Sequence, residues 1–307
     1  PADLDQRVRG HGQHRAGLPE GPAGAHAAPE AALHEPCTPR EDNDVDAADL
    51  PTARSWFSLT WVTSRTAVIT EPHVDGLLQA NLWYLRGRER DLLVDTGNGV
   101  APVRPLLERL AHGRPRDVVA LVTHAHIDHI GGFHEFDRRL LHRAEADAAA
   151  RIGEQVPLAT ATWSPDLKER LADNGFLLPP LLVDAVPREG FDPAAFHITP
   201  TAPTHFIEGG DTIDLGSRRL TVVDLPGHTA GSVGLLDEEE KALLSGDAAY
   251  EGQLIDTLAE SNVEAYARTM ERLLALEVDV VYPGHGRPFG QATLRRIARD
   301  YLRSAGG

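Results

Sequence analysis

Cysteine is almost absent from this sequence, which has a single thiol, Cys37, in 307 residues. One cysteine excludes an internal disulfide and a thiolate-rich zinc cluster, so a metal site here must be built from histidine and carboxylate side chains. No apolar run approaches the roughly 18 residues of a membrane span, and no basic start followed by an apolar signal core is present. These absences predict a soluble, cytoplasmic protein without a membrane partner.

Positive charge is also scarce, because 30 Lys and Arg residues face 46 Asp and Glu residues, for a formal net charge of -16. An acidic average surface repels phosphates, which argues against nucleic acid as a partner. The hydrophobic share of 41% is nevertheless enough for a sizeable buried core. We therefore expect a small-molecule partner, and the sequence leaves the oligomeric state open, a homodimer included.

The chain divides into two stretches of different texture. Residues 1–53 are rich in Ala, Pro, Gly, His and charge without a sustained period, which predicts a flexible N-terminal extension without chemistry. Over 54–307, apolar strand-like runs alternate with helical patterns, as is typical of a layered α/β or α+β domain. The histidines of the extension are His11, His14, His26 and His34.

The predicted elements of this domain are short. The predicted strands are Gln79–Leu85, Asp91–Val94, Val118–Thr123, Leu220–Leu225, Val233–Leu236, Ala242–Leu244 and Val278–Tyr282. The predicted helices, with apolar residues three or four apart, are Val103–Ala111, Val263–Leu276 and Ala292–Leu302. Glycine-rich loops are expected at Thr96–Gly99, Glu208–Asp211 and Asp214–Gly216. The proline-broken apolar stretch Phe176–Val183 is either a lid or substrate wall, or ordinary packing.

A dense run of potential metal ligands follows one of the predicted strands: His124, His126, Asp128 and His129. Side chains two apart on extended backbone point the same way, so His124 and His126 can hold one metal ion. A turn can then direct Asp128 and His129 at a second ion. The run therefore predicts a metal site rather than a polar surface turn.

Two further predicted strands end in the same tripeptide, Pro-Gly-His, which places His228 and His285 at strand ends. Proline lacks the N–H that continues a strand ladder, and glycine permits the backbone angles that turn the next side chain away from the strand tip. Alone, either tripeptide would be an ordinary turn, but with the first run they predict two more ligands. Asp247, directly after another strand, offers a carboxylate that can bridge two ions.

The motifs His-x-His-x-Asp-His, Pro-Gly-His-Thr-x-Gly-Ser, Ser-Gly-Asp and Pro-Gly-His-Gly follow one another in an order and spacing that resembles the metallo-β-lactamase superfamily, over about 60–300. The resemblance implies an α+β fold, a four-layer αββα sandwich with two metals at one edge between two sheets. It also implies a division of the ligands into a first site of His124, His126 and His228, a second of Asp128, His129 and His285, and a shared Asp247. With His228 present and no cysteine in place of Asp247, the set is similar to that of glyoxalase II and lactonases rather than of antibiotic-degrading enzymes.

Residues beside the ligands have implied roles too. Asp95 corresponds to the superfamily aspartate that supports the metal loop by accepting from a ligating histidine or from backbone, with a plain turn as the alternative. Gly131 and Gly132 would allow close backbone approach beside the metals. Thr229 and Ser232 could simply cap the segment after His228.

The ligand set favours zinc and permits manganese or iron. Two ions holding a water between them can lower its pKa from 15.7 to about 7, which predicts acyl hydrolysis by a metal-bridging hydroxide. Asp128 is the candidate catalytic residue that orients this water and carries its proton to the leaving group. Tyr250, three residues after Asp247, is a second candidate, because its phenol could donate to the developing oxyanion. A tyrosine packed at the sheet edge is the alternative.

The stretch Ser245–Asp256 resembles the acyl-coenzyme A thioesterase branch of the superfamily, and Asn81–Trp83 and Phe133–Asp137 point the same way. The branch implies a fatty acyl thioester whose chain lies on the apolar middle segment. Its carrier phosphates would meet arginines that are otherwise an ordinary solvated face: Arg138, Arg139 and Arg143.

The predicted function is a dinuclear zinc hydrolase of an ester-type acyl bond, with an acyl-CoA or other thioester as the preferred substrate. A lactonase or β-lactam hydrolase is the first alternative, and a persulfide dioxygenase with a single iron is the second. A nuclease would need a basic surface that the sequence does not show. A metal-binding protein without turnover is the non-enzymatic alternative.

Overall fold

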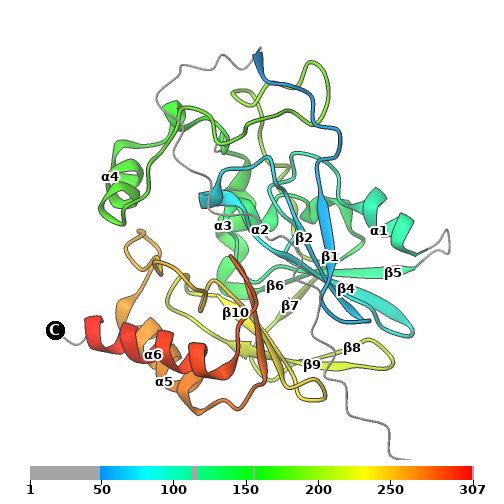
Figure 1. The fold of residues 1–307 in the computed structure, drawn as a ribbon, viewed down its shortest axis with the longest axis vertical. Coiled ribbons are helices and arrows are strands. Elements are labelled where there is room, and N and C mark those ends of the chain that lie inside the picture. Colours follow the sequence, from blue (N-terminus) through cyan, green and yellow to red (C-terminus); the bar gives the residue numbers. More distant parts are fainter. Residues whose placement is uncertain (1–48, 112–115, 155, 306–307) are drawn as a thin grey trace, which may run out of the picture. The chain divides into compact units, whose positions relative to one another are not determined.

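The computed structural model describes residues 49–111, 116–154 and 156–305, all of which lie in the unit Pro39–Gly307 (Figure 1). Residues 1–48, with Cys37 and the histidines of the predicted extension, lie outside the described residues. The boundary at residue 53 stays a prediction. Just before it, Thr52 pairs with Val186 in an isolated β-bridge.

The first sheet is mixed and has the strand order β1-β2-β3-β4-β5-β6-β7. Its strands are β1 (Ser58–Trp61), β2 (Thr66–Thr70), β3 (Leu82–Leu85), β4 (Arg90–Val94), β5 (Asp117–Leu121), β6 (Arg138–His142) and β7 (His205–Ile207). Neighbours pair antiparallel from β1 to β4 and parallel from β4 to β7.

The second sheet is also mixed and has the order β12-β11-β10-β9-β8. Its strands are β8 (Thr212–Asp214), β9 (Arg219–Asp224), β10 (Val233–Asp237), β11 (Ala242–Gly246) and β12 (Val280–Pro283). Only β11 and β12 pair parallel, whereas the other neighbours pair antiparallel.

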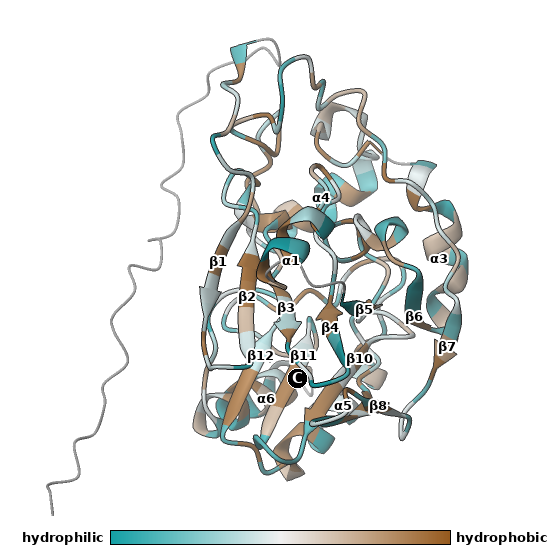
Figure 2. Cartoon of the chain, turned by 90° about the vertical axis from the view of Figure 1, so that its right-hand side faces the viewer, coloured by the Kyte–Doolittle hydropathy of each residue, from teal (hydrophilic) through white to brown (hydrophobic). Residues whose placement is uncertain are grey.

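The two sheets pack face to face around a shared apolar cluster. Trp83 and Leu121 of the first sheet and Leu235 and Leu244 of the second belong to one buried group. Figure 2 shows β2, β10 and β12 coloured largely as hydrophobic. Strands β3 and β4 are almost wholly buried, and the apolar runs Leu82–Leu85 and Leu92–Val94 fit strands that are covered on both faces.

Helices cover the outer face of each sheet. The α-helices are α1 (Arg104–Leu110), α2 (Ile127–Ile130), α3 (Ala146–Arg151), α4 (Pro165–Asp173), α5 (Val263–Ala275) and α6 (Gln291–Ala305). Leu107 of α1 and Ala149 of α3 pack on the first sheet, and Met270 of α5 and Ile297 of α6 pack on the second. The predicted α+β sandwich with four layers, αββα, is therefore confirmed.

Residues of the middle segment form a separate apolar cluster. Leu182 and Val183 are buried there with Trp163 and with Leu171 of α4. Val74 forms an isolated bridge with Val183, so part of the predicted lid or wall serves ordinary packing. Helix α4 begins after Ser164, whose side chain accepts from the Leu167 N–H at 3.2 Å.

Each predicted strand and helix has a counterpart, with ends moved by a few residues. The predicted strand Gln79–Leu85 begins only at Leu82, because the Asn81 N–H donates to the Gly284 carbonyl instead of to a strand neighbour. Strands β1, β2, β6, β7 and β8 and helices α2 to α4 were not predicted. None of the helices in the described part of the chain is long and apolar enough to cross a membrane.

The topology brings the functional candidates to one edge of the sandwich. Strands β4 and β5 run parallel in the first sheet, and β9, β11 and β12 share one direction in the second. Asp95, His124, His228, Asp247 and His285 each follow the carboxyl end of one of these strands. Residues distant in sequence therefore meet at this edge.

Candidate metal centre

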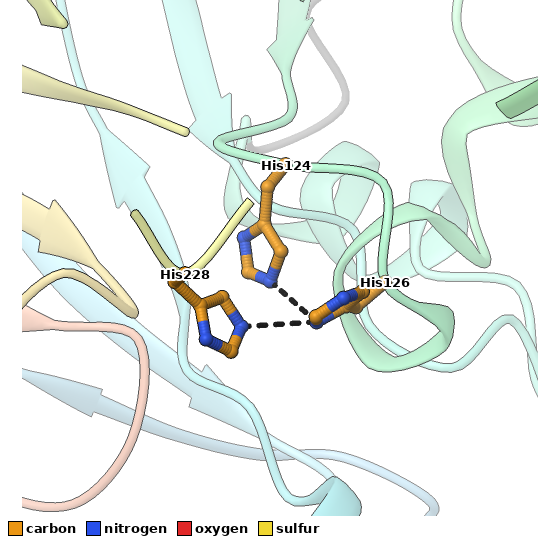
Figure 3. A group of neighbouring side chains, drawn as sticks. All are labelled: His124, His126 and His228. Carbon is orange, nitrogen blue, oxygen red and sulfur yellow. Dashed lines mark hydrogen bonds between the residues drawn. The ribbon is translucent and has the colours of Figure 1, made fainter. Parts of the chain in front are cut away.

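Three histidines converge beyond the ends of β5 and β9 (Figure 3). The Nε2 atom of His124 lies 3.1 Å from Nδ1 of His126, and Nε2 of His228 lies 3.0 Å from the same Nδ1. His124 and His228 are buried, and His126 is partly buried. Their ring nitrogens form one of the groups in which all potential ligand atoms lie within 4.8 Å of one another. The first site implied by the family resemblance therefore has its three side chains together.

A second group forms around His129 and His285. The Nε2 atom of His285 lies 3.1 Å from Oδ2 of Asp128, and the Nε2 atom of His129 lies 3.3 Å from that oxygen. Asp128 and His129 are on the short helix α2, which is the turn predicted to direct them away from His124 and His126. These three residues again form a compact potential ligand group.

Asp247 connects the two groups. Its Oδ2 lies 3.3 Å from His285 Nε2 and 3.7 Å from His228 Nε2, and its Oδ1 lies 3.5 Å from His129 Nε2. The predicted bridging carboxylate thus contacts histidines of both sites.

Two buried atoms in this cluster have no hydrogen-bond partner among the described residues: His129 Nε2 and Asp247 Oδ1. Buried polar atoms are normally hydrogen-bonded, because leaving one unpaired costs free energy. His129 and Asp247 also form, with His124, a third group whose potential ligand atoms all lie within 4.8 Å of one another. Imidazole nitrogen and carboxylate oxygen are common ligands of divalent metals. The residues therefore fit a metal centre.

The protonation states of His124, His228 and Asp247 suit metal ligands. Burial among other imidazoles lowers the pKa of His124 well below its usual value, and burial lowers the pKa of His228 to about 4. Burial raises the pKa of Asp247, but the charges of His285 and His129 outweigh it and hold that pKa well below the usual range. Neutral imidazole and ionised carboxylate are the forms that bind metals.

Hydrogen bonds fix which nitrogen each histidine presents. His228 Nδ1–H donates to the Ile255 carbonyl at 2.8 Å, which leaves Nε2 as the acceptor. His129 Nδ1 lies 2.9 Å from Asp95 Oδ2, and Asp95 Oδ1 also accepts from the Thr123 N–H at 2.7 Å. Asp95 therefore has the support contacts that the family resemblance implied.

The loop of His285 is held from the first sheet. The Asn81 side chain donates to the carbonyls of Pro283 and Gly286, at 3.0 and 2.8 Å, and the Trp83 indole donates to the Pro283 carbonyl at 2.9 Å. The Asn81–Trp83 stretch thus positions a candidate ligand across the sandwich.

Close backbone approach at the metal loop is also present. A Cβ atom at Gly131 would lie 2.1 Å from the carbonyl carbon of Asn98. Thr229 and Ser232 contact each other in the turn after His228, where the Ser232 hydroxyl accepts from the Thr229 N–H at 3.2 Å.

One carboxylate beside the ligands was not predicted. Glu260 Oε1 lies 2.8 Å from His126 Nε2, which donates to it and leaves Nδ1 to face His124 and His228. The hydrogen bond from His126 is the main reason why the pKa of Glu260 is lowered. No periodicity or motif in the sequence around Glu260 marks this contact.

Tyr250 lies beside the second group, with its ring 5.7 Å from that of His285 between centroids. Its hydroxyl donates to the Gln253 carbonyl at 2.6 Å. Burial, and then the charge of Asp247, raise the pKa of this phenol, so the hydroxyl keeps its proton. Its catalytic role stays a prediction, which requires the hydroxyl to turn away from Gln253.

A cavity of about 860 Å³ opens beside the cluster. Its walls include the ligand candidates His126, Asp128, His228, Asp247 and His285 together with Tyr250. Apolar side chains line much of the rest: Leu77, Leu78, Ile127, Trp163, Leu167, Leu171, Phe176, Ile255 and Leu258.

The three arginines expected to meet phosphates do not line this cavity. Arg138 pairs with Asp117, at 3.5 Å between Nη1 and Oδ2, and Arg139 Nε–H donates to the Ala202 carbonyl at 2.9 Å. Arg143 stacks on the Phe206 ring at 4.1 Å. The alternative interpretation of these arginines, as an ordinary surface, fits these contacts, because none of the three side chains lines the cavity.

Comparison with known proteins decides the family. Residues 75–285 match the model of the metallo-beta-lactamase superfamily. The chain belongs to this superfamily. The match spans all seven candidate ligands, from His124 to His285.

Curated relatives cover most of the chain. The human protein named acyl-coenzyme A thioesterase MBLAC2 is 35% identical over 267 residues, covering 83% of this chain and 90% of its own. Its Bos taurus counterpart is 36% identical over the same shares. The chain is accordingly a metal-dependent hydrolase of the superfamily.

Solved structures agree on the fold. A metallo-beta-lactamase family protein of Thermus thermophilus, TTHA1429, matches with a TM-score of 0.57 and 27% identity, over 80% of this chain and 81% of that one. A metallo-beta-lactamase from Pontibacter korlensis matches with a TM-score of 0.56 and 18% identity, over 80% of this chain and 99% of its own, and shows the fold alone.

Proposed function

We propose that this chain hydrolyses acyl-coenzyme A thioesters at a dinuclear zinc centre. One observation carries the proposal: the apolar cavity begins at the ligand cluster, so an acyl chain on its wall brings a thioester carbonyl to Asp128, Asp247 and His285. The similarity to proteins named acyl-coenzyme A thioesterase supports the same substrate class.

The apolar wall suits a fatty acyl chain. Ligand sites for apolar groups are concave and mostly hydrophobic, with few polar groups at the reacting end. Leu167 and Leu171 project from one face of α4, four residues apart, and Ile127 follows the first histidine pair. An acyl chain on these side chains would be withdrawn from water while its carbonyl faces the polar cluster.

The ligands of the proposed centre are divided as the family resemblance implies. His124, His126 and His228 would hold one ion, Asp128, His129 and His285 the other, and Asp247 both. Zinc suits a mixed set of imidazole and carboxylate, and the set also accommodates manganese or iron. Bound there, divalent ions would supply Lewis-acid polarisation and make water acidic enough to lose a proton near neutral pH.

Asp128 is the residue we propose for proton transfer. Burial raises its pKa, but the nearby charge of His129 and the contact with His285 Nε2 at 3.1 Å outweigh burial and hold the pKa well below the usual range. Its carboxylate is therefore ionised and can orient a water molecule and accept its proton. A thiol leaving group has a pKa near 8.5, so thioester cleavage needs little help from an acid.

Tyr250 would contribute on the carbonyl side. Its hydroxyl is a protonated donor in the cavity wall, and rotation away from Gln253 would let it donate to the oxygen on which charge develops. Arg151, an exposed residue of the same wall, is the cation better placed than Arg138, Arg139 or Arg143 to meet the phosphates of the carrier.

A substrate panel tests this function. Thiol release would be measured for acetyl-CoA, a long-chain fatty acyl-CoA and a glutathione thioester, alongside opening of a lactone and a β-lactam. We expect kcat/KM to be highest for acyl-CoA and to rise with chain length. Hydrolysis of the lactone, β-lactam or glutathione thioester without any acyl-CoA turnover would contradict the proposal, as would sulfur-dependent oxygen uptake with one iron per chain.

A further inference from the structure

Glu145 contacts both chain segments that carry the three histidines of the first group. It ends the 3-10 helix η4 (Arg143–Glu145), and only 3% of the residue is exposed. Its Oε2 accepts from the Ala125 N–H at 2.9 Å. Its Oε1 accepts from the Thr229 hydroxyl at 2.8 Å and from the Gly231 N–H at 2.7 Å.

Two of these donors are sequence neighbours of the three histidines of the first group. Ala125 lies between His124 and His126, and Thr229 directly follows His228. The two segments come from different sheets, because one follows β5 and the other follows β9. One buried carboxylate therefore joins the segments at the point where His126 Nδ1 and His228 Nε2 are 3.0 Å apart.

The partners of Glu145 argue against a role in neutralising a buried cation. No Lys, Arg or His of 49–111, 116–154 or 156–305 forms an ion pair with it. Burying a carboxylate without a cation costs free energy unless several hydrogen bonds compensate. Here the three donors lie within three residues of candidate ligands, and two of the donors are backbone N–H groups in fixed directions.

We propose that Glu145 is a positioning residue that fixes the separation of the His124–His126 segment from His228, and with it the geometry of the first metal site. The proposal rests on the metal centre of the proposed function and is independent of the substrate. Groups that orient metal ligands change metal affinity by about 10- to 100-fold when they are lost.

Two substitutions at Glu145 remove either all or only some of its three hydrogen bonds. Glu145→Ala removes all three. Glu145→Gln keeps the shape but turns one oxygen into a donor, which must then face either the Ala125 N–H or the pair of Thr229 and Gly231. We expect zinc affinity to fall by about 10- to 100-fold in Glu145→Ala and by less in Glu145→Gln.

Thr229→Val is a milder variant, because it keeps the buried carboxylate and removes only the hydroxyl, which donates to Glu145 and also contacts the Ser232 hydroxyl at 2.8 Å. Glu135→Gln is the matched control. Glu135 also accepts two backbone N–H bonds, from Val103 at 3.1 Å and Arg104 at 2.9 Å, but these lie at the start of α1. This control should lose thermal stability and keep its zinc affinity.

The experiment uses the full chain in two measurements. Zinc affinity is measured by competition with a chromophoric chelator, and the visible spectrum of the cobalt-substituted protein reports the ligand geometry. A purely structural role for Glu145 would lower the melting temperature but leave both readouts as in the unchanged protein. Positioning predicts weaker zinc binding and an altered cobalt spectrum in the Glu145 variants.

The outcomes separate the two proposals. If the unchanged protein binds neither zinc nor cobalt, the metal centre itself is wrong, and the proposal for Glu145 falls with it. If the unchanged protein binds and the folded Glu145 variants match it in affinity and spectrum, only the role of Glu145 is overturned. If both Glu145 variants fail to fold, Thr229→Val decides, and an unchanged affinity and spectrum there overturns the role.

Discussion

A Cβ atom on Gly284 would lie 2.0 Å from Oδ1 of Asp247. The Gly284 N–H also donates to the Gly246 carbonyl at 2.8 Å, so the two segments touch through their backbones. Glycine before His285 therefore does more than turn the chain, because it leaves room for the carboxylate that connects the two ligand groups.

Gly284→Ala should displace Asp247. Forcing a methyl group into a closely packed site costs about 1–3 kcal/mol, and here the group that must move is a candidate ligand. We expect loss of bound metal and of hydrolysis, measured by elemental analysis and thiol release. Gly290→Ala is the control, since its Cβ would meet nothing closer than the Asp279 carbonyl at 3.6 Å. Normal metal content in Gly284→Ala would show that Asp247 is not needed.

Leu167→Ala should weaken binding of long acyl chains selectively. Leu167 lines the cavity, and each buried CH₂ contributes about 0.8 kcal/mol, so losing the contact of about two of its carbons should raise KM for a long-chain acyl-CoA on the order of tenfold. KM for acetyl-CoA should not change, because a two-carbon acyl group ends near the ligand cluster.

The control for this prediction is Leu177→Ala, a residue that is 77% exposed and does not line the cavity. Equal increases in KM for both substrates with Leu167→Ala would place the acyl chain elsewhere.

Glu260→Gln should weaken metal binding at the first site. The carboxylate accepts from His126 Nε2 at 2.8 Å and so raises the basicity of the opposite ring nitrogen. Loss of the charge should lower zinc affinity about tenfold. Glu251→Gln is the matched control, because Glu251 also lines the cavity but pairs with Arg296, at 2.7 Å, instead of with a candidate ligand. Competition titration compares the two variants, and equal affinities would count against this role for Glu260.

Metal removal should make stability depend on pH. Burial lowers the pKa of His285, but the charge of Asp247 and hydrogen bonding to Asp128 outweigh burial. Without a metal ion they raise the pKa to about 10. A histidine with a raised folded pKa stabilises the fold fully below its unfolded value of about 6.5. That contribution is lost as pH rises through the folded value.

The melting temperature of chelator-treated protein should therefore fall as pH rises from the unfolded toward the folded pKa of His285. The zinc-loaded protein should change less, because zinc replaces the proton. Thermal unfolding with and without zinc over this pH range measures the difference between the two melting temperatures, which should widen as pH rises. In chelator-treated His285→Gln, the melting temperature should depend less on pH. If the difference between the zinc-loaded and the chelator-treated melting temperature narrows with rising pH, the raised pKa of His285 is refuted.

The ligand cluster could be predicted from sequence because its signals are local. His124, His126, Asp128 and His129 are contiguous, and His228 and His285 share a tripeptide that turns a side chain off a strand end. The short apolar run of β4 and the helical spacing of apolar residues in α6 were predicted for the same reason.

The supporting contacts could not be predicted because their signals are not local. Glu145 lies 20 positions from Ala125 and 84 from Thr229, and its neighbours read as the start of an exposed helix. Edge strand β1 is only partly buried, and β7 and β8 have three residues each, so neither alternation nor length marks them. Strand β6 begins with two arginines and ends with a histidine, so its sequence does not have the apolar character expected of a parallel strand.

We propose a dinuclear zinc centre that cleaves acyl-CoA thioesters, held by His124, His126, Asp128, His129, His228, Asp247 and His285. Its most direct test is a stoichiometric zinc titration of metal-free protein, followed by thiol release from a long-chain acyl-CoA. We expect activity to appear with zinc and to reach its plateau at two ions per chain. Full thioesterase activity in the metal-free protein, or a plateau at one ion per chain, would contradict the claim.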